Sequence, residues 1–317
     1  MRVLITGGTG LLGKALFQTK PQKYSALGVH LRKIRWRSNA VENVQLDIRN
    51  KMCVEQLFKR QKFDVVIHAA GIASVDYVKN NYSESLESNI VGTLNISSAC
   101  RKNGSYLIYI SSNAVFDGSS PPYDETSIPK PINEYGEIKL ECERLIEKTI
   151  PSSCIIRPIL MYGWNCPEGR SNPVTWVLEQ IIKGQKIKLV NDVWENPLYN
   201  VDAAKAIWKA VLIKPTGKIH LAGPEVVNRY QLAMQTVEIF GLDQSLITPV
   251  SSDYFLQLAS RPKNTSFSLT KMSKDLGITP LSIKGGLQAM KKELLIKMKN
   301  PKRLGEIAPY LIKYFKA

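Results

Sequence analysis

The chain has 317 residues, 44% of them hydrophobic and 8% aromatic, a composition that excludes a largely disordered protein. No apolar run reaches the roughly 18 residues of a membrane span, and the opening residues MRVLITGGTG turn to glycine too early for a signal peptide, so we expect a cytoplasmic protein without membrane contact. The formal net charge of +16 favours an anionic ligand, but no arginine-rich tract, zinc finger or RNA-binding aromatic motif accompanies it, so no nucleic-acid partner is expected.

The first half of the chain alternates short apolar runs with amphipathic segments. Strands are predicted at 2–6, 24–30, 43–48, 63–71, 106–112 and 154–163, and helices at 11–18, 51–60 and 85–103. Near-continuous apolar strands of this kind are typical of a parallel sheet that is buried on both faces. With right-handed crossovers, the pattern predicts an α/β fold with a doubly wound parallel sheet of the Rossmann type.

After about residue 162 the pattern loosens and predicts a smaller C-terminal substrate lobe. Helices are predicted at 174–184 and 229–242 and late in 196–213, with one more strand at 217–223. We expect an NADP-binding Rossmann domain from residues 1–160 with about 190–222, and a substrate-binding lobe from about 161–189 with 223–300. The segment 301–317 is expected to form a basic C-terminal helix.

Five cysteines are scattered along the chain at positions 53, 100, 142, 154 and 166. No two of them form a CxxC pair, and their number is odd. We therefore expect reduced thiols, with neither a metal site nor a disulfide framework.

A glycine-rich turn, ITGGTGLLG, follows the first predicted strand and opens the first predicted helix. Gly7, Gly10 and Gly13 have the spacing that serves a tight turn, a close approach of backbone to ligand, and close helix packing. The first helical turn, at Leu11 and Leu12, offers free N–H groups and the positive end of the helix dipole to a phosphate. This context predicts a dinucleotide site.

The end of the second predicted strand, VHLRK, lacks the acidic residue that usually binds the ribose of NAD(H). Arg32 and Lys33 instead suit a 2′-phosphate, because their side chains are cationic and the Arg fork is bidentate. We therefore predict NADP(H) as the cofactor, with NAD(H) as the second choice; a solvated basic surface is the competing interpretation. Asp47 is interpreted either as an acceptor for the adenine amine or as a turn residue.

Tyr135 and Lys139 are four residues apart in PINEYGEIKLECERLI and would share one face of a helix. A phenol has an ordinary pKa of about 10, and a nearby ammonium is expected to lower it toward the range useful for proton transfer. Ser112 lies at the carboxyl end of the fifth predicted strand, at the edge where parallel sheets bind ligands. We predict that Tyr135 protonates a substrate oxygen as hydride reaches the carbon, that Ser112 orients this oxygen, and that Lys139 holds the nicotinamide ribose.

These motifs, together with HAAG at 68–71 and Asn89, resemble the extended short-chain dehydrogenase/reductase family. Within it, the chain is most similar to the dTDP-4-dehydrorhamnose reductase branch and to a relative of that branch, the regulatory beta subunit of methionine adenosyltransferase. The likeness spans about residues 1–290. It rests on the segments YISSNAVFDGSSPPYDE, PKPINEYGEIKLECE, IHLAGPE and SRPKNTSFSL.

The resemblance implies a role for each matching position. It implies that Ser112, Tyr135 and Lys139 are catalytic, and that Asn89 fixes a helix distortion near the lysine. On the substrate side it implies Asp76, Ser112, Asp117, Gly118 and Arg261. The implied cofactor contacts are Gly7, Gly10, Leu11, Leu12, Gly13, Arg32, Lys33, Asp47, Ile48, Ala69, Ala70, Gly71, Asn89, Tyr135, Lys139 and Pro158.

The chain departs from the rhamnose reductases at two places. Asn113 and Ala114 stand where those enzymes carry an acid and a phenol, and Leu160 stands where they place a tryptophan. The favoured function is NADPH-dependent reduction of a keto group on a nucleotide-activated deoxysugar, a small-molecule substrate. A regulatory NADP-binding subunit and a nucleotide-sugar epimerase remain as alternatives, and a homodimer is left open.

Overall fold

The computed structural model describes residues 1–31, 42–166, 169–255 and 259–299. The predicted 2′-phosphate residues Arg32 and Lys33 and the predicted terminal helix at 301–317 lie outside these ranges. Within them, no helix has the length and apolar character needed to cross a bilayer.

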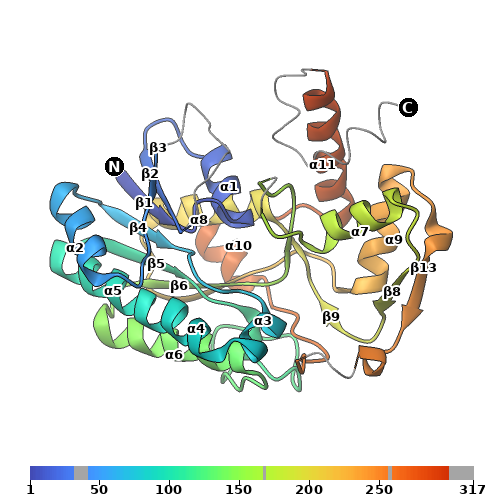
Figure 1. Ribbon diagram of the computed structural model, residues 1–317, viewed down its shortest axis with the longest axis horizontal. Coiled ribbons are helices and arrows are strands. Elements are labelled where there is room, and N and C mark those ends of the chain that lie inside the picture. The colour runs from blue at the N-terminus through green and yellow to red at the C-terminus, as the bar shows by residue number, and fades with distance from the viewer. Residues whose placement is uncertain (32–41, 167–168, 256–258, 300–317) are drawn as a thin grey trace.

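A seven-stranded sheet runs through the described part of the chain in the order β11-β6-β5-β4-β1-β2-β3 (Figure 1). All neighbouring strands are parallel, as predicted. Because the chain moves outward in opposite directions on the two sides of β1, the switch point of the sheet lies between β1 and β4. The strands are β1 Arg2–Thr6, β2 Ser25–His30, β3 Glu42–Gln45, β4 Val65–His68, β5 Tyr106–Ile110, β6 Cys154–Pro158 and β11 Gly217–Leu221.

Helices cover both faces of this sheet, which makes it doubly wound (Figure 1). In β1, Val3 and Ile5 face one core and Leu4 faces the other, and all three are fully buried. A strand buried on both faces needs an unbroken apolar run, which explains the sequence RVLIT. One face carries α1 Leu11–Gln18, α8 Asn200–Ile213 and α10 Thr270–Leu276; the other carries α2 Lys51–Arg60, α5 Gly92–Asn103 and α6 Glu134–Thr149.

Three predicted elements differ from the structure for local reasons. The third strand ends at Gln45 because the Asp47 carboxylate accepts the backbone N–H of Arg49 and turns the chain. The sixth ends at Pro158, and β7 Met161–Tyr162 then pairs with β10 Leu198–Tyr199. The predicted helix at 85–103 is interrupted by a π-helix at Glu87–Val91, after α3 Val75–Asn80 and α4 Tyr82–Leu86.

The second half of the chain has an apolar core of its own, formed by helices at the other side of the molecule (Figure 1). Its helices are α7 Pro173–Ile182, α9 Arg229–Phe240 and α11 Ile283–Met298. Its paired strands are β8 Ile187–Val190 with β13 Ile247–Val250, and β9 Trp194–Glu195 with β12 Val227–Asn228. Short 3₁₀ turns lie at Asn113–Val115, Gln244–Leu246 and Ser252–Phe255. The proposed domain limits stay predictions.

Candidate active site

Two glycines of the ITGGTGLLG turn are required by the packing of the protein itself. Gly7 has φ +73°, and a Cβ atom there would lie 2.8 Å from the carbonyl oxygen of Ala69. A Cβ atom on Gly13 would lie 2.4 Å from the carbonyl oxygen of Gly7. The turn is therefore held against the end of β4 on one side and against its own helix on the other.

Gly10 differs from these two glycines. A Cβ atom at Gly10 would meet only the Gly7 oxygen, at 3.3 Å, so the protein interior does not demand a glycine. Gly10 caps α1, and within the described residues no side chain caps the free N–H groups that begin at Leu11 and Leu12. The N-terminus of α1 is thus uncapped, and the glycine beside it has open space on its outer side. A pyrophosphate could approach this backbone closely and accept hydrogen bonds from its N–H groups.

The loop after β3 carries Asp47 and Ile48. Arg49 binds the Asp47 carboxylate through Nη2 at 2.7 Å, and this hydrogen bond lowers the pKa of Asp47. The amide of Asn95 donates to the carbonyl oxygens of Ile48 and Arg49, at 3.0 and 2.9 Å, and anchors the loop to α5. In this arrangement Asp47 serves the turn, which was one of its two interpretations.

The segment Ala69–Gly71 leaves β4 opposite the glycine turn. The N–H of Ala70 donates to the Thr6 hydroxyl at 3.1 Å, and this hydroxyl bonds His68 at 2.7 Å. A Cβ atom on Gly71 would lie 2.3 Å from Asn89 Oδ1. This backbone is therefore set closely against Thr6 and Asn89.

Asn89 lies inside the π-helix, so the distortion expected there is present. Its amide donates to the carbonyl oxygens of Ser85 and Ile72, at 2.9 and 3.3 Å, and its own carbonyl oxygen accepts from the Cys142 thiol on α6. The widened turn thus packs against the helix that carries Tyr135 and Lys139.

Ser112 and Tyr135 come together because α6 docks against the turn that follows β5. A Cβ atom on Gly136 would lie 2.1 Å from the carbonyl oxygen of Ala114. The Ser112 hydroxyl accepts the Ala114 N–H at 3.1 Å and donates to Asn113 Oδ1 at 3.3 Å. Burial raises the pKa of Tyr135 to about 12, and a hydrogen bond with Ser112 opposes this rise.

Lys139 is directed toward the strand end and not toward the phenol of Tyr135. Its ammonium donates to the Ile110 carbonyl oxygen at 2.9 Å and to the Tyr109 hydroxyl at 3.2 Å, and burial lowers its pKa. The cation that acts to lower the pKa of Tyr135 is Arg170, whose effect is smaller than that of burial. The expectation that Lys139 acidifies Tyr135 is therefore wrong for this arrangement of side chains.

The predicted substrate-side residues form two connected groups. Arg261 Nη2 pairs with Asp76 Oδ2 at 2.6 Å. Burial alone would raise the pKa of Asp76, but hydrogen bonds from Arg261 and Ala259 outweigh it and leave the pKa lowered. Gly118 has φ +84°, and a Cβ atom there would lie 2.8 Å from Pro262, so the Asp117–Gly118 turn packs beside Arg261.

Several polar residues near these groups were missed by sequence reasoning. The Asn113 amide donates to Thr265 Oγ1 at 2.7 Å and to Glu195 Oε1 at 3.4 Å, which links the residue after Ser112 to β9. Arg170 lies in a loop that Asn165 closes by donating to the Arg170 carbonyl oxygen at 2.7 Å. These residues are far apart in sequence and have no spacing signal, so only the tertiary structure brings them together.

Pro158, an implied cofactor contact, and Trp164 each occupy a structural position in the fold. Pro158 ends β6 in register with Leu221 of β11. Trp164 packs in the second core and donates to the Met290 carbonyl oxygen at 2.9 Å. Among the described residues, no group of three or more His, Cys, Asp or Glu side chains is arranged to hold a metal ion.

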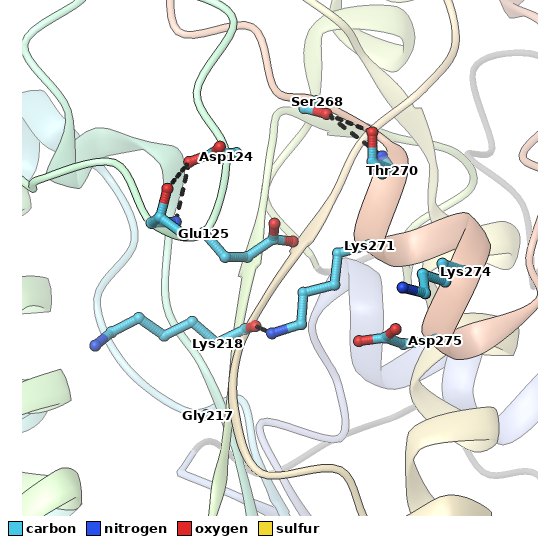
Figure 2. Close-up of a pocket in the computed structure, with 10 residues that line it drawn as sticks. Asp124, Glu125, Gly217, Lys218, Ser268, Thr270, Lys271, Lys274 and Asp275 are labelled. Carbon is cyan, nitrogen blue, oxygen red and sulfur yellow. Dashed lines mark hydrogen bonds between the residues drawn. The ribbon is translucent and has the colours of Figure 1, made fainter.

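A groove of about 560 Å³ lies elsewhere, along the outer edge of β11 (Figure 2). It is lined by the first residues of that strand, Gly217 and Lys218, and by Lys271, whose ammonium donates to the Lys218 carbonyl oxygen at 2.6 Å. Parallel sheets bind ligands at the carboxyl ends of their strands. This groove is at the opposite end of β11 and does not belong to the site.

The family model for the RmlD substrate binding domain matches residues 1–296. The chain belongs to this family. It is 29% identical over 293 residues to methionine adenosyltransferase 2 subunit beta of Rattus norvegicus, covering 89% of this chain and 85% of the relative. It is also 29% identical to dTDP-4-dehydrorhamnose reductase of Aggregatibacter actinomycetemcomitans, covering 88% and 94%.

A solved structure of dTDP-4-dehydrorhamnose reductase from Bacillus anthracis, in complex with NADP, superposes with a TM-score of 0.80 at 26% identity. The match covers 92% of this chain and 99% of the reductase. The Rossmann-type fold of the extended short-chain dehydrogenase/reductases is therefore shared over nearly the whole length of both proteins.

Proposed function

We propose that the protein reduces a keto group on a nucleotide-activated deoxysugar with NADPH. The observation that carries this proposal is the contact of Gly136 with Ala114, which docks Tyr135 of α6 against the Ser112 turn at the carboxyl end of β5. This is the edge of the sheet at which the glycine turn also opens. Family membership and the NADP-bound reductase of similar fold support the same function.

In the proposed reaction, the reduced nicotinamide supplies the hydride that adds to the keto carbon. The Tyr135 hydroxyl gives its proton to the keto oxygen, so that a hydroxyl replaces the carbonyl. Because burial keeps the pKa of Tyr135 near 12, the phenol is protonated at neutral pH and available as a donor. Ser112, which hydrogen-bonds Tyr135, orients the same oxygen, and Lys139 binds the ribose next to the ring.

We propose NADP(H) over NAD(H) because Arg32 and Lys33 follow β2, where a 2′-phosphate is bound in this fold. The test is the affinity for each reduced cofactor. Tighter binding of NADPH is expected, with the preference lost in the double variant Arg32→Ala/Lys33→Ala. Tighter binding of NADH would contradict this choice.

Asp76, Asp117, Gly118 and Arg261 are proposed to contact the sugar nucleotide. Arg261 offers a partly exposed guanidinium that pairs with Asp76, and the excess of positive charge favours an anionic substrate. The base and the sugar are best identified by offering keto-sugar nucleotides of both dTDP and UDP.

The decisive experiment is NADPH oxidation by the wild-type protein and by Tyr135→Phe. We expect the substitution to lower kcat by roughly 10²–10⁴-fold, because the proton donor is lost, while NADPH still binds. The control is Tyr82→Phe, which removes the hydroxyl of a tyrosine that is 44% exposed on α4. Full activity in Tyr135→Phe would remove the mechanism.

A regulatory subunit is the second candidate. Methionine adenosyltransferase 2 subunit beta is similar over 89% of this chain, and Ala114 stands where reductases carry a phenol. This function predicts NADPH binding without turnover and co-purification with a catalytic methionine adenosyltransferase subunit. Turnover of a keto-sugar nucleotide with no such association would favour the reductase.

A further inference from the structure

A buried ion pair lies directly behind the Ser112 strand end. Arg157 of β6 donates from Nη2 to Glu143 Oε2 at 2.6 Å and from Nε to Glu143 Oε1 at 2.9 Å. The exposed fractions of the two side chains are 0% for Arg157 and 1% for Glu143. A bidentate pair of this kind fixes the relative position of the strand and the helix that carry it.

The carboxylate connects this pair to the proposed catalytic residues. The Ser111 hydroxyl donates to Glu143 Oε1, and Ser111 directly precedes Ser112. Glu143 follows Lys139 by four residues on α6, one helical turn further along the same face. One carboxylate therefore links the strand end that carries Ser112 to the helix that carries Tyr135 and Lys139.

The guanidinium extends the connection to the substrate side. Arg157 Nη1 donates to His220 Nε2 at 3.3 Å, so the neutral imidazole donates from Nδ1 to the Tyr123 carbonyl oxygen at 3.4 Å. The Tyr123 hydroxyl donates to Asp117 Oδ1 at 2.8 Å. The network thus ends on the turn that is proposed to contact the sugar nucleotide.

Stability alone does not account for this network. Removing two charges from water costs several kcal/mol per ion, and apolar residues of similar volume are often neutral or stabilising in their place. A buried polar network of this kind can instead specify the structure, by favouring one arrangement of the elements over others that would pack equally well.

We propose that Ser111, Glu143, Arg157 and His220 are positioning residues that hold Ser112 against Tyr135 and couple this pair to the Asp117 turn. None of the four acts on the substrate directly; they act through Ser112 and Asp117. The inference rests on the proposed reductase function and adds to it the residues that set the geometry of the reaction.

The test compares Ser111→Ala and the apolar double variant Glu143→Leu/Arg157→Met with Glu147→Gln. Glu147 is the matched control, because it lies on the same helix and pairs with Lys218 at the surface. For Ser111→Ala and the double variant we expect folded proteins, although the double variant should have a lower Tm because it leaves the buried Ser111 hydroxyl and His220 imidazole without partners. We expect an unchanged Kd for NADPH, and kcat lowered by up to about a hundredfold from misplacement of the reacting groups. Glu147→Gln should keep the wild-type kcat. A folded double variant with wild-type kcat would overturn the proposal.

A second measurement separates this proposal from the proposed function. If the wild-type protein turns over no keto-sugar nucleotide, the reductase function fails, but the positioning can still be read from NMR of protein labelled with ¹³Cζ-tyrosine. The resonance missing in Tyr135→Phe reports on the Ser112–Tyr135 hydrogen bond. Movement of this resonance in Ser111→Ala, but not in Glu147→Gln, supports positioning; an unmoved resonance contradicts it.

Discussion

Gly136 and Ala114 touch so closely that a Cβ atom on the glycine would lie 2.1 Å from the alanine carbonyl oxygen. This contact sets the distance between α6 and the turn after β5, and with it the distance between Tyr135 and Ser112. Because the clash would be with backbone, neither partner can yield by rotating a side chain. The geometry of the site therefore depends on the absence of a single methyl group.

We expect Gly136→Ala to lower both stability and activity. Overpacking of this kind costs about 1–3 kcal/mol, and the displaced helix would move Tyr135 away from Ser112. Thermal unfolding and NADPH oxidation measure the two effects. Gly285→Ala on α11 is the control, because its Cβ atom would meet only side-chain atoms, the nearest being Ser282 Oγ at 3.2 Å. Wild-type kcat in Gly136→Ala would contradict the dependence on this contact.

The glycine turn allows a matched pair of substitutions. Gly13→Ala would place a Cβ atom 2.4 Å from the Gly7 carbonyl oxygen, so we expect a clear loss of Tm. Gly10→Ala would place a Cβ atom 3.3 Å from the same oxygen, so we expect a folded protein. This variant should bind NADPH more weakly, since the added methyl group would occupy the open side of Gly10, where the pyrophosphate is proposed to bind. Unchanged affinity in a folded Gly10→Ala protein would place the cofactor elsewhere.

The rate of reduction should be insensitive to pH near neutrality. Burial raises the pKa of Tyr135 to about 12, so the proton donor stays protonated, and deprotonation lowers the rate only as the pH approaches that value. Oxidation of the product alcohol needs the phenolate and should accelerate roughly tenfold per pH unit over the same range. Initial rates in both directions measure this. A reduction rate that falls with a midpoint near pH 7 would show that Tyr135 ionises much more easily.

Acid should destabilise the fold through its buried histidines. Burial lowers the pKa of His68 and of His220 to about 3, whereas an unfolded histidine takes up a proton near pH 6.5. The unfolded state therefore binds more protons between these values, and stability is lost as the pH falls through this window. Urea unfolding at several pH values in this window gives the unfolding free energy as a function of pH, and its slope gives the number of protons taken up on unfolding. This number should be about one smaller in His68→Asn than in the wild-type protein. An uptake in His68→Asn equal to that of the wild-type protein would contradict this account.

The sequence predicts the scaffold well because its signals are local. Unbroken apolar strands such as RVLIT and the glycine spacing at 7, 10 and 13 are set by burial on two faces and by steric contacts within one turn. The end of β3 at Gln45 could not be predicted, because Asp47 fits a strand end and a turn equally well until Arg49 is seen to bind it.

The electrostatics of the site were predicted less well. Spacing on a helix places Tyr135 and Lys139 on one face. The Lys139 ammonium, however, donates to oxygen atoms of Ile110 and Tyr109, and burial is then the largest influence on the pKa of Tyr135. The link from Ser111 through Glu143 to Arg157 joins the turn after β5 to α6 and β6. Such partners are chosen by tertiary packing, which no spacing along the chain reveals.

The most direct test is transfer of deuterium from NADPH labelled at the hydride-donating carbon. Wild-type protein, saturated with the labelled cofactor and given a keto-sugar nucleotide, should yield an alcohol with one deuterium on the former keto carbon, and Tyr135→Phe should yield almost none. If the wild-type protein, saturated with cofactor, leaves the sugar unlabelled and the cofactor fully reduced, the reductase account is contradicted. The protein would then bind the dinucleotide without transferring its hydride.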